Sequence, residues 1–154
     1  MDKTIVIAEA GVNHNGSIEQ AKKLVEIAAK AGADYVKFQT FKADNLVSKH
    51  AEKAEYQKAV TNKDESHYEM IKKLELDYEM HLQLIDFSNK MGINFLSTPF
   101  DIKSIKLLVD LGLEKIKIPS GEITNLPYLR YAGSMNKPVL MSTGMATLNE
   151  VQAA

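Results

Sequence analysis

The sequence contains no cysteine among its 154 residues, which excludes disulfide bonds and thiolate metal sites within it. It also lacks an excess of charge of one sign, because 19 Lys and Arg oppose 20 Asp and Glu and leave a net charge of -1. A nearly neutral chain has no overall field that attracts nucleic acid or anionic lipid. We therefore expect no nucleic acid and no membrane as partners, and local groups must hold any anionic ligand.

Long hydrophobic runs are missing as well. No apolar stretch approaches the roughly 18 residues that a membrane-spanning helix needs. The first residues, MDKTIVIAEAG, lead directly into a strand pattern without the apolar core and cleavage site of a signal peptide. These absences predict a soluble, cytoplasmic protein. A hydrophobic content of 45% is ordinary for one globular domain with a core.

Short β-rich runs alternate with helical stretches along the chain. Strand patterns cover residues 4–11, 34–41, 93–100, 114–120 and 137–144. Helical patterns cover residues 17–32, 67–75, 78–91, 102–111, 126–132 and a stretch from Thr147 onward, whereas residues 42–66 are polar and irregular. Ser17 is the expected N-cap of the first helix, with Gln20 in position for a capping box and Gly32 at its end.

This alternation predicts an α/β fold with parallel strands, since the crossovers are helical. Two architectures fit: a doubly wound open sheet, or an incomplete (β/α)8 TIM barrel. A complete barrel needs about eight units and roughly 250 residues, so this chain supplies about five of them. In the second case residues 1–154 are only a portion of a barrel domain. Composition does not choose between the two architectures.

Polar residues cluster at the carboxyl ends of the expected strands. The set comprises Glu9, Lys37, Gln39, Thr98, Lys117 and Ser142. Charge inside a parallel sheet is costly unless it is paired, and ligands of α/β folds, barrels especially, bind at this end of the strands. Two lysines, hydroxyls and glycine-flanked N–H groups on one rim suit a phosphate or carboxylate.

Less specific explanations exist for each residue. Lys37 could extend its charge to the surface, or form a purely structural ion pair with Glu9. Thr98 and Ser142 could cap the helices that follow them. Lys115 is expected to be solvated or to face a helix.

The Pro-Ser-Gly-Glu corner after the fourth strand adds two candidates. Ser120 lies where the strand turns into a loop. Glu122 is a plausible general acid or base, because we expect it among the cations of this rim. Neutral donors and acceptors for a sugar or carbonyl substrate are available from Gln39, Asn13 and Asn15.

Five motifs together resemble the N-terminal catalytic barrel of the sialic acid synthases. This family comprises N-acetylneuraminate synthases and the relatives that make legionaminic and pseudaminic acids. The resemblance runs along the whole chain in the order IAEAGVNHNG (7–16), VKFQTFKA (36–43), FLSTPFD (95–101), KIPSGEITNLPYL (117–129) and LMSTGMATLNEV (140–151).

The resemblance implies a condensation of phosphoenolpyruvate with an N-acylated amino sugar, typically N-acetylmannosamine, with release of phosphate. Mapped by motif onto this chain, it assigns the phosphoenolpyruvate carboxylate to Lys37, Thr98 and Ser120, and the phosphate to Lys117 and Ser142. It assigns the sugar to Glu9 and Gln39, and the proton or water at the reacting enol to Glu122. N-acetylneuraminate synthase is the first interpretation, with a legionaminic or pseudaminic acid synthase as the alternative.

The same resemblance implies parts that this chain lacks. The remaining strands, a C-terminal antifreeze-like domain and a homodimer belong to the family. So does a divalent cation, Mn²⁺ or Mg²⁺, held by two histidines of later strands. The four histidines here, at positions 14, 50, 67 and 81, do not fall on those motif positions, so no metal ligand is assigned. We expect a fragment that is inactive by itself.

Other functions remain open from the residues. A 3-deoxy-heptulosonate-type synthase and a simple aldolase are enzyme alternatives, although an aldolase needs a Schiff-base lysine in an apolar pocket. A non-catalytic, phosphate-binding half-barrel is the alternative from another class. Release of phosphate in the presence of an acceptor sugar separates the synthases from the rest.

Overall fold

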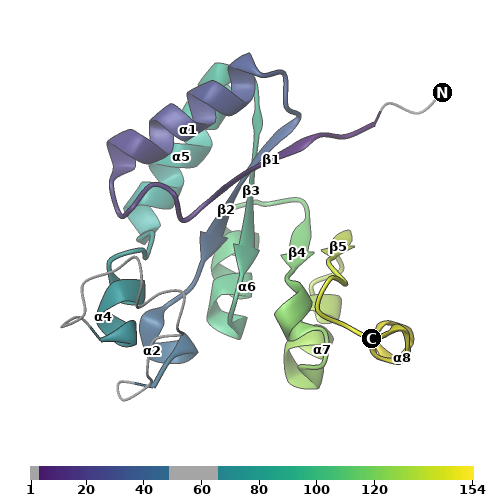
Figure 1. Ribbon diagram of the computed structural model, residues 1–154. Helices are drawn as coiled ribbons and strands as arrows, with labels where there is room; N and C mark the ends of the chain where they lie inside the picture. The colour runs from purple at the N-terminus through teal and green to yellow at the C-terminus, as the bar shows by residue number, and fades with distance from the viewer. Residues whose placement is uncertain (1–3, 49–65) are drawn as a thin grey trace.

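The computed structural model describes residues 4–48 and 66–154 (Figure 1). Parallel strands alternate with helices, as the sequence predicts. The strands are β1 (Ile7–Gly11), β2 (Tyr35–Thr40), β3 (Asn94–Pro99), β4 (Ile116–Ile118) and β5 (Val139–Met141). The helices are α1 (Ile18–Lys30), α2 (Ala43–Leu46), α4 (His67–Lys72), α5 (Tyr78–Met91), α6 (Ile102–Asp110), the 3-10 turn η1 (Ser120–Glu122), α7 (Leu126–Ser134) and α8 (Leu148–Ala153).

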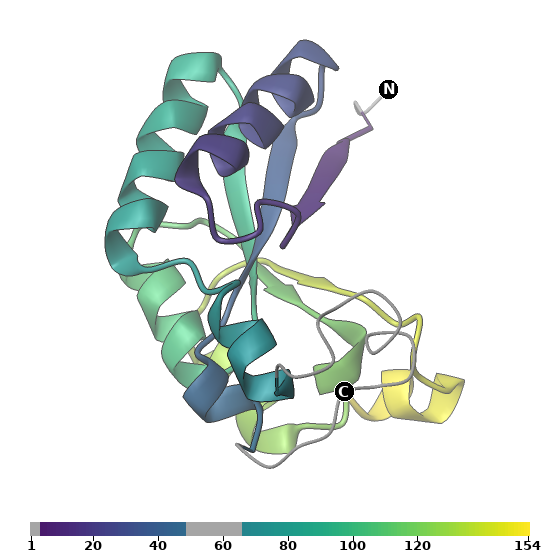
Figure 2. The same cartoon turned by 60° about the vertical axis from the view of Figure 1, so that its left-hand side comes forward.

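The strands form a curved parallel layer in chain order. β1, β2 and β3 are hydrogen-bonded in that order, and β4 pairs with β5. β4 lies beside β3, and the buried Tyr128 hydroxyl of α7 donates to the Pro99 carbonyl of β3 over 2.8 Å. Figure 2 shows α1, α5 and α6 on one side of β1, β2 and β3. This is an incomplete (β/α)8 barrel, whose inner side is open.

Alternation along β2 divides its side chains between two faces. Val36, Phe38 and Thr40 are buried, whereas Lys37 and Gln39 between them are only half-buried. The buried face packs against α1 and α5 in a core that includes Ala21, Val25, Leu84 and Ile93. A second core lies between β4, α6 and α7 and comprises Ile105, Ile116, Ile118, Tyr128 and Ala132. The helices thus occupy one face and leave the other to the polar residues.

Caps explain where several helices begin and end. Asp77 accepts the Met80 N–H at the start of α5, and Gly92 ends that helix with a left-handed φ of 71°. Ser17 accepts the Gln20 N–H at the start of α1. The expected capping box is only half formed, because the Ser17 N–H donates to the His14 carbonyl instead.

Some expected boundaries are wrong. Residues 4–6 are not in a strand, and Ile5 and Val6 are 57% and 52% exposed. The start of the polar segment after β2 is not irregular but forms α2, because Glu75 accepts the Ala43 N–H at 2.7 Å and pairs with Lys42 at 3.0 Å. The strand expected over 114–120 is shorter, since Pro119 leads into η1.

The remainder of that polar segment, residues 49–65, lies outside the described residues, as does His50. Within the part that the structure describes, none of the helices combines the length and the apolar character needed to cross a membrane.

Candidate functional site

The candidate site begins with an ion pair on the inner face of β1 and β2. Glu9 and Lys37 are register partners in these strands, and their side chains form a salt bridge. Lys37 also donates to the Thr98 hydroxyl of β3 over 3.1 Å. The Lys37 side chain is 14% exposed, but that of Glu9 is 50% exposed, so the pair faces open space on one side.

A second lysine approaches from β4. The Lys117 ammonium donates to the Ser142 hydroxyl after β5 and to the Ile118 carbonyl at 2.7 Å. Burial lowers the pKa of Lys117, and the charge of Lys37 lowers it further, whereas Glu9 raises it. Two cations and one carboxylate therefore share one electrostatic environment. Such a pair of cations favours a ligand with two anionic groups.

Gln39 lies beside Glu9 because of a bulge in β1. The pairing of β1 with β2 shifts between Glu9 and Gly11, and Gly11 takes a left-handed φ of 55°. A Cβ at Gly11 would stand 3.2 Å from a Glu9 carboxylate oxygen and 3.7 Å from the Gln39 amide nitrogen. The glycine thus permits a carboxylate and a neutral amide to meet on one side of the strand, which suits hydroxyl recognition.

The Pro-Ser-Gly-Glu corner follows β4 and carries Ser120 and Glu122. The Glu122 carboxylate accepts from the Asn125 amide at 2.7 Å, and Ser120 is half-buried at the start of η1. Glu122 also lines a cavity of about 400 Å³ with Asp101 and Lys103. Within residues 4–48 and 66–154, no hydrogen bond or ion pair connects Ser120 or Glu122 directly to Lys37 or Lys117. The roles expected of Ser120 and Glu122 stay predictions.

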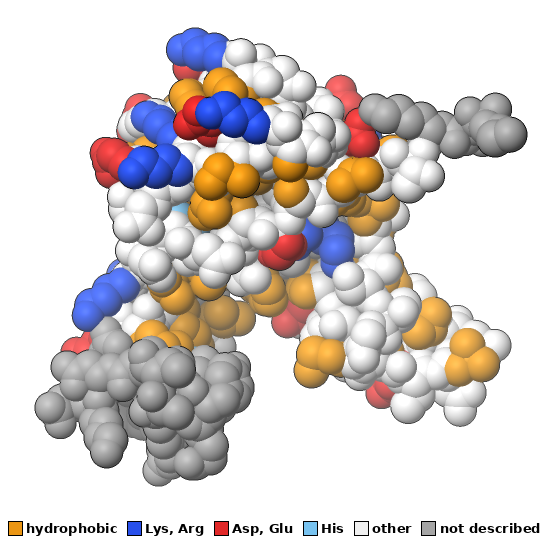
Figure 3. Space-filling model, turned by 45° about the horizontal axis from the view of Figure 1, so that its top comes forward, with side chains coloured by type: hydrophobic (Ala, Val, Ile, Leu, Met, Phe, Trp, Pro, Cys, Tyr) orange, Lys and Arg blue, Asp and Glu red, His pale blue; other side chains and the backbone are white. Residues whose placement is uncertain are grey.

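A space-filling view gives the setting of the inner face. Figure 3 shows this side of the molecule hollowed below its upper body, with an acidic and a basic group together in the hollow and hydrophobic side chains around them. The side chain of Glu9 on this face is 50% exposed. The inner face is therefore accessible.

Two buried histidines lie behind this face and were not identified as a pair from the sequence. His81 of α5 donates from Nδ1 to the Asp77 carbonyl at 2.6 Å, so in its neutral form Nε2 accepts the Thr40 hydroxyl at 2.8 Å. Thr40 in turn accepts from Ser97 at 2.7 Å. The position of His81 on the inward face of a helix was the available signal.

His14 is held in the loop after β1 by a backbone hydrogen bond. Its Nδ1 accepts the Gly16 N–H at 3.0 Å, while its Nε2 has no partner in the described part of the chain. Burial lowers the pKa of both His14 and His81. Both are therefore neutral near pH 7. The described residues contain no group of three or more His, Asp or Glu that could hold a metal ion.

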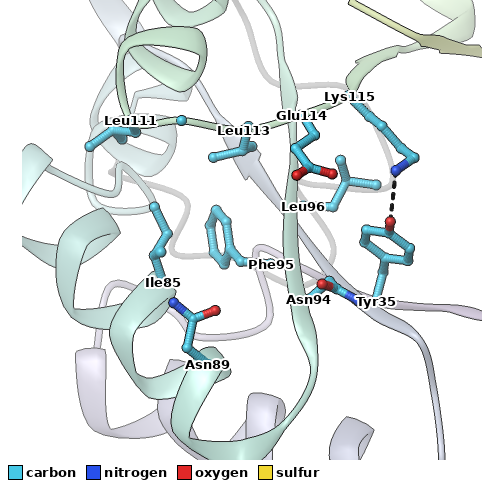
Figure 4. A pocket seen from close by; sticks show the side chains of 11 residues that line it. Tyr35, Ile85, Asn89, Asn94, Phe95, Leu96, Leu111, Leu113, Glu114 and Lys115 are labelled. Carbon is cyan, nitrogen blue, oxygen red and sulfur yellow. Dashed lines mark hydrogen bonds between the residues drawn. The ribbon is translucent and has the colours of Figure 1, made fainter.

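The pocket in Figure 4 lies at the opposite end of the strands. Its cavity of about 220 Å³ is bordered by Tyr35 and Asn94 at the amino ends of β2 and β3, and by Glu114 and Lys115. Lys115 was expected to be solvated or to face a helix. Instead its ammonium donates to the Tyr35 hydroxyl at 2.8 Å and lies 5.2 Å from the ring centroid. This contact is far from the carboxyl ends where the candidate site residues gather.

Comparison with known proteins gives one consistent result. Residues 24–154 match the NeuB family. The chain is 58% identical to the N,N'-diacetyllegionaminic acid synthase of Campylobacter jejuni over 154 residues, covering 100% of this chain and 46% of that protein. It is 55% identical to the enzyme of the same name from Legionella pneumophila, covering 97% of this chain and 42% of that protein.

The fold agrees with a solved relative. The N-acetylneuraminic acid synthetase of Leptospira borgpetersenii superposes with a TM-score of 0.80 at 30% identity, over 97% of this chain and 48% of that one. The chain thus spans less than half the length of these relatives. The resemblance that the sequence motifs indicated is confirmed: this chain belongs to the NeuB family of sialic acid synthases.

Proposed function

We propose that this chain forms the phosphoenolpyruvate-binding part of a legionaminic acid synthase. The proposed reaction joins phosphoenolpyruvate to a 2,4-diacetamido-trideoxyhexose and releases phosphate. The two relatives named as N,N'-diacetyllegionaminic acid synthases, at 58% and 55% identity, favour this acceptor over N-acetylmannosamine. The alternative from the sequence is thus better supported than its first interpretation, N-acetylneuraminate synthase.

The convergence of Lys37 and Lys117 is the observation that carries the proposal. Phosphoenolpyruvate has a carboxylate and a phosphate attached to the same carbon, and each requires a cationic partner. In the proposed arrangement Lys37, with Thr98 and Ser120, holds the carboxylate, and Lys117, with Ser142, holds the phosphate. Glu9 keeps the two ammonium groups from repelling each other when the ligand is absent.

The reaction needs one carbon–carbon bond and one cleaved carbon–oxygen bond. The methylene carbon of phosphoenolpyruvate attacks the aldehyde of the open-chain sugar, and the aldehyde oxygen becomes a hydroxyl. Water adds to the other enol carbon, and phosphate departs with its C–O bond broken, which leaves a nine-carbon 2-keto acid. Glu9 and Gln39 orient the sugar in this proposal, and Glu122, held by Asn125, handles the proton or water.

A divalent cation, Mn²⁺ or Mg²⁺, supplies polarisation of the aldehyde in the proposed enzyme. The residues that the structure describes offer no set of three ligands for it. Following the resemblance, we propose that histidines of later strands hold the metal, and we derive no step from it. A homodimer and an antifreeze-like domain of the complete protein belong to the same proposal.

The test measures phosphate release from phosphoenolpyruvate with Mn²⁺ and a panel of acceptors, on this chain and on the complete gene product in parallel. We expect release by the complete product, fastest with the 2,4-diacetamido-trideoxyhexose. Faster turnover of N-acetylmannosamine would restore the N-acetylneuraminate interpretation. No release with any acceptor from a folded complete product would leave the phosphate-binding half-barrel as the better function.

A matched pair of variants tests the lysine assignment in the same assay. Lys37→Met removes the proposed carboxylate partner and is expected to lower kcat/KM for phosphoenolpyruvate by about 100-fold or more. Lys90→Met removes an exposed lysine of α5 that pairs with Asp86, and is expected to leave kcat/KM unchanged. Equal activity of the two variants would contradict the assignment.

A further inference from the structure

A second cavity opens beside Gln39 at the carboxyl ends of β2 and β3. It measures about 270 Å³. Its wall is apolar and includes Val12 after β1, Phe41 after β2, and Ile71 and Leu74 in and after α4. Gln39 is the one polar side chain among its described lining residues. The cavity therefore combines an apolar wall with a single amide at its boundary with the candidate site.

The wall is not a closed part of the core. Ile71 and Leu74 are half-buried, and Leu46 of α2, which also borders the cavity, is 36% exposed. A well-packed interior leaves few voids larger than a water molecule. The cavity lies just below the roughly 300–1,000 Å³ of pockets that enclose a whole small molecule. It therefore has ample room for an apolar substituent of a ligand.

Gln39 connects this cavity to Glu9 and Lys37. Its amide nitrogen and a Glu9 carboxylate oxygen both flank Gly11, and Lys37 is its neighbour on the same face of β2. A sugar held by Glu9 and Gln39 can therefore direct one substituent into the apolar cavity. The side-chain amide both donates and accepts, so it can pair with an amide group at the entrance.

We propose that the cavity binds the methyl end of an N-acyl group of the acceptor sugar, with Gln39 hydrogen-bonded to the amide of that group. This inference rests on the proposed function and adds to it the part of the site that selects the acyl chain. An N-acyl group matches the polar entrance and the apolar wall of the cavity. Its amide lies next to the sugar ring, and its methyl group lies farthest from the ring. The deoxy methyl group of the sugar shares the apolar chemistry but has no adjacent amide for Gln39.

The test changes the depth of the cavity in opposite directions. Ile71→Phe places an aromatic ring at its wall and narrows it, and Ile71→Ala enlarges it. For the complete gene product we measure kcat/KM with acceptors that carry N-formyl, N-acetyl, N-propanoyl and N-butanoyl groups. We expect the ratio of acetyl to formyl acceptor to fall about ten-fold in Ile71→Phe, and the preference to move to longer acyl chains in Ile71→Ala.

Controls separate selection from general damage. KM for phosphoenolpyruvate is expected to stay constant in both variants. Ile27→Phe and Ile27→Ala change an isoleucine of α1 that is 63% exposed, and are expected to keep the wild-type acyl preference. An unchanged acyl preference in both Ile71 variants would overturn the inference. A change only in the preference between 6-deoxy and 6-hydroxy acceptors, with the acyl preference unchanged, would also overturn it.

A binding measurement distinguishes failure of the inference from failure of the proposed function. Saturation-transfer NMR with the 2,4-diacetamido-trideoxyhexose and its N-propanoyl analogue reports contact with the acyl protons without turnover. We expect transfer to these protons in the wild type and its loss in Ile71→Phe. Acyl contact without phosphate release would support the cavity assignment and contradict the proposed synthase reaction. Phosphate release without acyl contact would support the synthase reaction and contradict the cavity assignment.

Discussion

At the scale of single residues, the candidate site depends on three charges that influence one another. Glu9 pairs with Lys37, and both affect Lys117 from across the strands. Burial lowers the pKa of Lys117. The charge of Lys37 lowers this pKa further, and the charge of Glu9 raises it. The alternation of the strands predicted which residues share this face. It did not predict that burial lowers the pKa of Lys117, because that depends on contacts between β4 and β5.

Replacement of either neighbour of Lys117 should move its pKa in a defined direction. Lys37→Met removes a positive charge and is expected to raise the pKa of Lys117, whereas Glu9→Gln removes a negative charge and is expected to lower it. NMR titration of the lysine ε-carbons measures both shifts. Lys90→Met is the control that should leave this pKa unchanged. A common direction for the two substitutions would contradict the three-charge arrangement.

The buried histidines make stability depend on pH. Burial lowers the folded-state pKa of His14 and His81 below the unfolded value of 6.5, so the unfolded chain binds more protons as the pH falls. The contribution of these histidines to the free energy of unfolding should therefore be fully present above about pH 6.5. It should be lost progressively as the pH falls below that value. Each unit of pKa difference corresponds to about 1.4 kcal/mol.

Urea denaturation at pH 7.5 and pH 5.5 measures this loss. His81→Asn removes one of the titrating groups and is expected to make the difference between the two pH values smaller. The comparison uses the change in the free energy of unfolding between the two pH values. A destabilisation of the variant that is equal at both pH values does not affect this change. An identical loss in wild type and variant would assign the pH dependence to other groups.

At the scale of elements, the sequence predicted the long helices well and the short segments poorly. Asp77 and Gly92 mark the ends of α5, and the observed helix is Tyr78–Met91 as expected. The signals there are local: a cap, an apolar stripe and a glycine. α2 was missed because Glu75, more than 30 residues away, accepts its first N–H.

Gly16 fixes how the loop after β1 approaches the segment after α4. Its φ is 79°, and a Cβ there would lie 2.4 Å from the Lys73 carbonyl oxygen. Gly16→Ala is therefore expected to destabilise the fold more than Gly92→Ala, whose φ of 71° is similar but whose surroundings are open. The left-handed conformation alone should cost each variant about 1–2 kcal/mol. Urea denaturation of both variants measures the difference, and equal losses would show that the loop can move away from Lys73.

At the scale of the whole molecule, the open inner face leaves apolar surface exposed. Ile5 and Val6 precede β1, and Val139 of β5 is 40% exposed. Among the described residues, no strand pairs with the outer edge of β1 or of β5. Unpaired edges and apolar patches favour pairing with another chain.

The 154-residue chain is therefore expected to self-associate. Light scattering after size-exclusion chromatography, over a range of concentrations, should show a mass that rises with concentration. Val139→Lys places a charge on the edge of β5 and should reduce the association, whereas Ile27→Lys on the exposed face of α1 should not. A constant monomeric mass would indicate that the open face is tolerated in water.

The alternation along β2 also bears on how such proteins diverge. Val36 and Phe38 hold α1 and α5, while Lys37 and Gln39 between them touch only groups of the inner face. Mutations at one set of positions can therefore accumulate without displacing the other. A lineage can acquire a new acceptor through changes at inner positions and keep the same scaffold, and a thermally adapted lineage can repack its helices without altering its chemistry.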